Sequence, residues 1–189
     1  MIQETSPNFV VDTIIMSKLN IILYGRRNTG KTTALIKLVK LLVNNPAVST
    51  AIDAVLKNRN GRFKDARFLL DSPYGIIIIC TAGDTWTVSD QNCDLFKNSL
   101  SGKIPVYFVN SSGIVEYNGK TIRPFFDIQQ VKVCVCACQP SGDNDGAIKA
   151  LHYYSENHLM DYDEQRWIKA MPRDSTANAN ELFQIITNF

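Results

Sequence analysis

Apolar residues along this chain fall into short continuous runs, separated by segments in which they recur with helical spacing. The runs Leu19–Tyr24, 76–80 and Val131–Cys138 are apolar at nearly every position, which is typical of parallel strands covered on both faces. Residues 31–44 have helical spacing up to Asn44-Asn45-Pro46, where proline ends the helix. The same criteria predict further helices over residues 87–99, 145–157 and 178–189, and a last strand over residues 165–171.

Two segments predict antiparallel strands. Residues 66–70 and 76–80 are rich in β-formers and are joined by a turn-forming sequence, so they predict a hairpin. Residues 104–127 predict a β insertion, with Asn118-Gly119 as its strongest hairpin signal.

Helices that alternate with core strands predict an α/β fold of three layers around a mostly parallel sheet, interrupted by the hairpin and the β insertion. Residues 19–189 are interpreted as a single domain. Residues 1–18 are either a leader or an edge strand, because residues 8–15 contain enough β-branched side chains to pair at a sheet edge.

The most specific motif lies between the first strand and the first helix. The residues from Gly25 to Thr32 read G-x-x-x-x-G-K-T, the pattern of a phosphate-binding loop. In such a loop backbone N–H groups surround the phosphates, the lysine (Lys31) reaches the β- and γ-phosphates, and the hydroxyl of Thr32 binds Mg²⁺. The predicted nucleotide-binding residues are Gly25, Arg26, Arg27, Asn28, Thr29, Gly30, Lys31, Thr32 and Thr33.

Turnover of a bound nucleotide also requires an acidic group. Asp84 follows the strand 76–80 closely, at the sheet edge where ligands bind in open α/β folds. We therefore predict that Lys31 and Asp84 are catalytic and that Thr32 and Asp84 hold the metal. The alternative for Asp84 is a helix cap, and Asp71, in an apparent turn, is the rival acid.

Other side chains are weaker candidates for chemistry. Arg26, Arg27 or Arg173 would contribute positive charge near a γ-phosphate, although arginines in loops are more often only solvated. Cysteines 134, 136 and 138 alternate with apolar residues and therefore face one side of a strand. We interpret them as small buried hydrophobic side chains rather than metal ligands.

Composition limits the classes of partner and the compartment. The formal net charge of the 189 residues is +2, so bulk charge does not indicate nucleic acid or an anionic membrane as a partner. No apolar run is long enough to span a bilayer, and five cysteines without a secretory signal favour reduced thiols. We therefore expect a cytoplasmic protein. The sequence lacks the Asn/Thr-Lys-x-Asp element that reads guanine, which favours ATP over GTP.

The chain resembles a small family of single-domain P-loop proteins of bacteria and phages that are described as ATP- or GTP-binding. The residues that carry the resemblance are Gly25 to Thr33, Thr81-Ala-Gly-Asp-Thr85, the run Val131–Cys138 and Trp167-Ile-Lys. The chain departs from that family in its insertion at 104–127 and in a turn at Gln139 that lacks the family's arginine. The resemblance implies nucleotide binding and little about a substrate.

Three functions fit these patterns. The first is Mg²⁺-dependent binding and hydrolysis of a nucleoside triphosphate. The second is phosphate transfer to a small molecule or a nucleotide, with the basic segment 57–67 lining the acceptor. The third is a nucleotide-gated interaction module that docks a protein partner through the hairpin predicted at 113–123.

Overall fold

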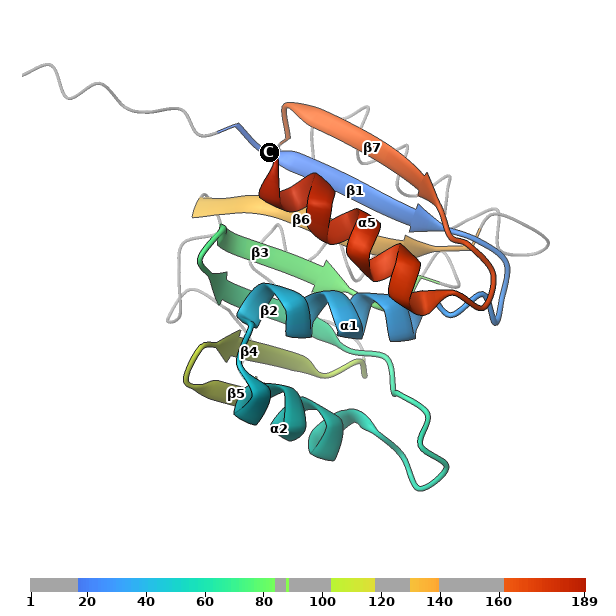
Figure 1. Ribbon diagram of the computed structural model, residues 1–189, viewed down its shortest axis with the longest axis vertical. Coiled ribbons are helices and arrows are strands. Elements are labelled where there is room, and N and C mark those ends of the chain that lie inside the picture. Colours follow the sequence, from blue (N-terminus) through green and yellow to red (C-terminus); the bar gives the residue numbers. More distant parts are fainter. Residues whose placement is uncertain (1–16, 84–87, 89–102, 118–129, 140–161) are drawn as a thin grey trace, which may run out of the picture.

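The computed structural model describes residues 17–83, 88, 103–117, 130–139 and 162–189 (Figure 1). Its strands are β1 Leu19–Tyr24, β2 Arg67–Ser72, β3 Gly75–Cys80, β4 Val106–Asn110, β5 Gly113–Tyr117, β6 Val131–Cys138 and β7 Glu164–Lys169. The helices in these ranges are α1 Lys31–Val43, α2 Pro46–Leu56 and α5 Ser175–Thr187. All seven strands belong to one sheet with the order β5-β4-β2-β3-β6-β1-β7.

The centre of the sheet is parallel. β1 pairs in parallel with β6 on one side and with β7 on the other, and β6 also pairs in parallel with β3. Nearly every residue of β1 and β6 is buried, which is why both strands are almost continuously apolar in sequence. The predicted α/β class with a mostly parallel sheet is therefore confirmed.

The predicted hairpin and part of the predicted β insertion are present. β2 and β3 form the predicted hairpin, while β4 and β5 form an antiparallel pair at the sheet edge. The turn between β4 and β5 follows Asn110, whose side-chain oxygen accepts hydrogen bonds from the N–H groups of Ser112 (2.8 Å) and Gly113 (3.1 Å). The Asn118-Gly119 signal and the remainder of the predicted insertion lie outside the described residues.

Residues Asn44, Asn45 and Pro46 end one helix and begin the next. Asn44 has left-handed backbone angles at the end of α1, whereas the side-chain oxygen of Asn45 accepts a hydrogen bond from the N–H of Ala47 at 2.9 Å. Pro46 occupies the first turn of α2, where its missing N–H costs nothing. The prediction that α1 ends at this sequence is confirmed, and a second helix, α2, begins at Pro46.

The three described helices lie on the same face of the sheet (Figure 1). Side chains of that face, such as Ile21 and Leu23, form a core with α1, α2 and α5. The opposite face, which includes Ile22 and Ile78, is buried as well. The predicted helices at 87–99 and 145–157 and the first 16 residues lie outside the described ranges, so the third layer stays a prediction. None of the described helices combines the length and the apolar character needed to cross a membrane.

Candidate functional site

The loop between β1 and α1 contains the left-handed backbone angles from which anion-binding nests of N–H groups are built. Its first residue, Gly25, is tied to the sheet because its N–H donates to the carbonyl of Cys138 at 3.1 Å. Asn28 (φ 63°) and Gly30 (φ 88°) adopt left-handed angles, and the hydroxyl of Thr29 donates to the carbonyl of Arg26 at 2.9 Å. Left-handed residues placed between ordinary ones direct successive N–H groups to one side, which creates a concave surface suited to anions.

The start of α1 adds to this positive character. Gly30 is the N-cap residue and has no side chain that could bind the first N–H groups of the helix. Its left-handed φ is also one that residues with a Cβ rarely adopt. The amides of the first turn and the partial positive charge of the helix dipole therefore act at the same point, which favours a bound anion.

Lys31 lies across the loop. Only 6% of the residue is exposed, and its Nζ donates to the carbonyls of Gly25 (2.7 Å) and Arg26 (3.1 Å). A buried ammonium group needs such partners, because removing it from water without them is costly. The loop backbone therefore holds the charge of Lys31 in place beside the nest.

Thr32 and Thr81 both donate hydrogen bonds to a carboxylate that the motif does not contain. The hydroxyl of Thr32 donates to Oδ1 of Asp65 at 2.9 Å, and the hydroxyl of Thr81 donates to the same oxygen at 3.3 Å. Thr81 is itself fixed, since its hydroxyl accepts the N–H of Ala66 at 2.9 Å. Asp65 is therefore the acid that the described residues place against the predicted metal ligand Thr32.

The sequence did contain a signal for Asp65, but only through strand pairing. The hairpin register pairs Arg67 with Cys80, so residues 65 and 66 continue toward Ala82 and Thr81. An antiparallel hairpin thus brings the residues just before its first strand to the end of its second strand. Asp65 precedes its strand, whereas Asp84 follows an apolar strand, so the pattern of acids at strand ends indicates Asp84 and not Asp65.

The loop, the start of α1, Thr81 and part of the segment 57–67 line a cavity of about 550 Å³ at the edge of the sheet. Its described lining consists of Arg27, Asn28, Thr29, Gly30, Lys31, Thr32, Thr33, Gly61, Arg62, Phe63 and Thr81. Three of these residues are cationic, namely Arg27, Lys31 and Arg62, and none is acidic. A cavity of this size and charge suits a small anionic ligand.

The structure brings together most of the predicted nucleotide-binding residues. Residues 27–33 line the cavity, while Gly25 and Arg26 are outside its described lining and hold Lys31 through their carbonyls. Arg173 is exposed in the turn before α5 and does not belong to the described lining. Asp71 pairs with Ile76 at the opposite end of the hairpin and borders a separate depression of about 300 Å³, so this rival acid is remote from the loop.

Asp84 itself lies outside the described residues, but the residue before it is fixed. The carbonyl of Gly83 accepts the N–H of Gln139 at 3.1 Å, and a Cβ added at Gly83 would lie only 1.7 Å from the carbonyl oxygen of Ala137. β6 therefore lies between the end of β3 and the loop strand β1. The metal, catalytic and capping roles of Asp84 all stay predictions.

The cysteines lie together in the face of the sheet opposite the described helices. Cys134, Cys136 and Cys138 share this face, as predicted, and the first two Sγ atoms are 3.6 Å apart. A hydrogen bond with Cys136, together with burial, raises the pKa of the Cys80 thiol well above its ordinary value of 9.0, so it stays protonated at neutral pH. No group of three or more His, Cys, Asp or Glu residues suited to a metal ion occurs among the described residues.

Comparison with family models, with curated proteins and with solved structures gave no significant match. The resemblance to small P-loop proteins therefore stays a prediction that depends on the motif residues.

Proposed function

We propose that this chain binds a nucleoside triphosphate together with Mg²⁺ and hydrolyses its terminal phosphate. One observation carries the proposal: Lys31 and the start of α1, whose N-cap is Gly30, line the same cavity, and the charged residues of its described lining are all cationic. The triphosphate would lie on the N–H groups of residues 28–33, with Lys31 beside its β- and γ-phosphates.

Thr32 and Asp65 are the proposed protein ligands of the metal. Mg²⁺ prefers oxygen ligands at about 2.0–2.1 Å and is usually held by one or two carboxylates together with phosphate oxygens and water. The contact between the Thr32 hydroxyl and Asp65 already joins two such oxygens at 2.9 Å. We assign to Asp84 the orientation of the attacking water, the role expected from its position after the strand end.

ATP is the proposed nucleotide, and GTP is less favoured, because the sequence lacks the guanine-reading element.

Phosphate transfer to an acceptor is the second candidate. It is favoured by Gly61, Arg62 and Phe63 of the basic segment 57–67, which form one wall of the cavity. Docking of a protein partner at 113–123 is the third hypothesis. The structure describes only β5 of that segment. β5 is an edge strand, and its Val115 is 59% exposed.

Thermal unfolding with and without Mg-ATP tests the proposal. A ligand at 100 times its Kd stabilises the folded state by about 2.7 kcal/mol, and for a chain of this size that raises Tm by roughly 5–10 °C. Lys31→Ala should abolish the shift, because it removes the ammonium group at the β- and γ-phosphates. Lys103→Ala, which removes an exposed lysine outside the described cavity lining, should keep the shift. An equal shift in Lys31→Ala and the wild type would refute the assigned phosphate site.

A further inference from the structure

The basic segment opposite the loop is an ordered hairpin, here called the basic hairpin (residues 57–64). Lys57 and Phe63 form a β-bridge, and the N–H of Asn58 donates to the carbonyl of Arg62 at 2.9 Å. The side-chain oxygen of Asn58 also accepts hydrogen bonds from the N–H groups of Asn60 (2.9 Å) and Arg62 (3.0 Å). Arg62 is therefore held at its backbone by two hydrogen bonds.

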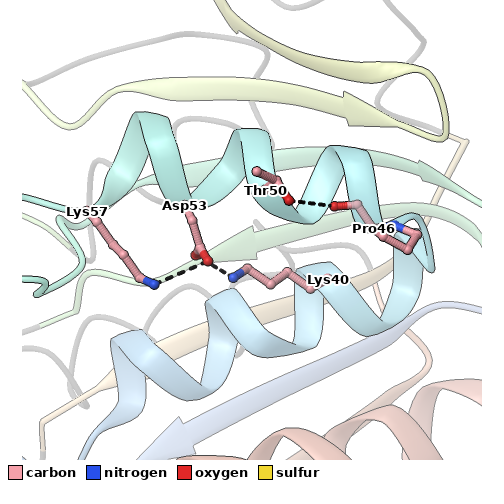
Figure 2. A network of polar contacts seen from close by, with 5 residues as sticks. All are labelled: Lys40, Pro46, Thr50, Asp53 and Lys57. Carbon is pink, nitrogen blue, oxygen red and sulfur yellow. Dashed lines mark hydrogen bonds and ion pairs between the residues drawn. The ribbon is translucent and has the colours of Figure 1, made fainter.

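The base of the basic hairpin is fixed to two helices. Asp53 of α2 forms an ion pair with Lys40 of α1 and a second one with Lys57, whose Nζ lies 3.2 Å from Oδ2 of Asp53 (Figure 2). Both ammonium groups also lie over the ring of Phe63, at 5.4 and 5.2 Å from its centre. Phe63 packs against the core of the helical face. These contacts hold the hairpin in one position relative to α1.

The basic hairpin lies at the end of the cavity where the γ-phosphate is expected. In a phosphate-binding loop the threonine after the lysine would hold the metal, whose charge would stabilise the terminal phosphates. That threonine is Thr32, which donates to Asp65, only three residues after Arg62. Of the four cationic residues of the hairpin, only Arg62 belongs to the described lining of the cavity.

We propose that Arg62 is a catalytic residue of the nucleotide site, whose guanidinium group binds the γ-phosphate during its transfer. The inference depends on the proposed function. In the reaction the oxygen of water bonds to the γ-phosphorus and the bond from that phosphorus to the β–γ bridging oxygen breaks. The bridging oxygen keeps the electron pair, and the proton of the water passes to the phosphate product. The planar fork of an arginine matches the phosphate oxygens and stabilises the charge on them.

The test compares three variants of the full chain in steady-state phosphate release from Mg-ATP. Arg62→Ala should lower kcat by at least about 100-fold, while the Kd for Mg-ATP changes by less than about tenfold. Arg62→Lys should recover only part of the loss, because an ammonium group lacks the fork. Arg59→Ala, on the same hairpin but outside the described lining, should retain the wild-type rate.

A binding measurement separates catalysis from other effects. Mg-ADP with aluminium fluoride mimics the phosphoryl group in transfer, and such mimics depend most on groups that act in the transition state. Arg62→Ala should weaken binding of this complex far more than binding of Mg-ADP. Equal losses for both ligands, a kcat within threefold of the wild type or a matching loss in Arg59→Ala would overturn the role of Arg62. If instead the wild type does not bind Mg-ATP at all, the proposed function itself fails.

Discussion

Thr32 and Asp65 are 33 positions apart in the sequence, yet a hydroxyl of one donates to a carboxylate of the other at 2.9 Å. The loop residues were predictable because the motif is local: eight consecutive residues determine the nest, the lysine and the threonine. Asp65 was not predicted, because its position depends on the pairing of β2 with β3 and on the packing of α1 over them. Local motifs thus identify one side of this site and tertiary contacts identify the other.

Substitution of Asp65 tests the proposed metal site. Asp65→Asn keeps an oxygen that accepts the hydrogen bonds of Thr32 and Thr81, so the fold should be unchanged. It removes the negative charge, so the Mg²⁺ concentration needed for half-maximal ATP hydrolysis should rise by roughly tenfold or more. Asp71→Asn, at the remote end of the same hairpin, is the matched control and should leave this concentration unchanged. Identical Mg²⁺ dependence in both variants would exclude Asp65 as a ligand.

Gly83 provides a test of packing at the same edge. Gly83→Ala places a Cβ only 1.7 Å from the carbonyl oxygen of Ala137, so β3 and β6 must separate locally. Overpacking of this kind costs about 3 kcal/mol in the free energy of unfolding. Gly113→Ala, whose added Cβ has no atom of the described residues within 4 Å, should change it by less than about 0.5 kcal/mol. Urea unfolding of the two variants measures the difference, and similar midpoints would contradict the close approach.

At the scale of elements, the sequence located most described strands and helices but not every turn. Continuous apolar runs predicted β1, β3 and β6 correctly, because strands buried on both faces admit few polar residues. The turn between β4 and β5 was not assigned to particular residues, because its signal is a single side chain, Asn110, whose oxygen accepts hydrogen bonds from the backbone just after it. In the same way the start of α2 depends on a single side chain, Asn45, which caps the helix.

The ion pairs that join α1, α2 and the basic hairpin predict a dependence of stability on pH. Burial acts to raise the pKa of Asp53, but hydrogen bonds and charge from Lys40 and Lys57 outweigh it and lower the pKa below 3.8. When folding lowers the pKa of a carboxyl group, the group stabilises the fold fully above the pKa of the unfolded state. This stabilisation is lost as the pH falls through the pKa of the folded state. Asp53→Asn should therefore cost about 0.5–1 kcal/mol at pH 7, and this cost should shrink as the pH falls below 3.8. Chemical unfolding of the wild type and of Asp53→Asn at pH 7 and at pH 3 measures this cost. A cost that is the same at both pH values would contradict its origin in the ion pairs of Asp53.

At the scale of the whole molecule, the candidate site lies where parallel strands of the sheet end. β1, β3, β6 and β7 share one direction, so their carboxyl ends meet at the edge that carries the loop, Thr81 and Gly83. The alternation of helices and strands predicted this class of fold, but it did not predict the order of the strands. That order places β6 between β1 and β3 and depends on pairings that a single sequence does not reveal.

A crystal structure with Mg²⁺ and a nonhydrolysable ATP analogue tests the central claim most directly. We predict that the triphosphate lies on the N–H groups of residues 28–33, with Nζ of Lys31 within hydrogen-bond distance of the β- and γ-phosphates. The metal should lie about 2.1 Å from the hydroxyl oxygen of Thr32. A triphosphate bound elsewhere, or a loop that stays empty at saturating analogue, would contradict the account.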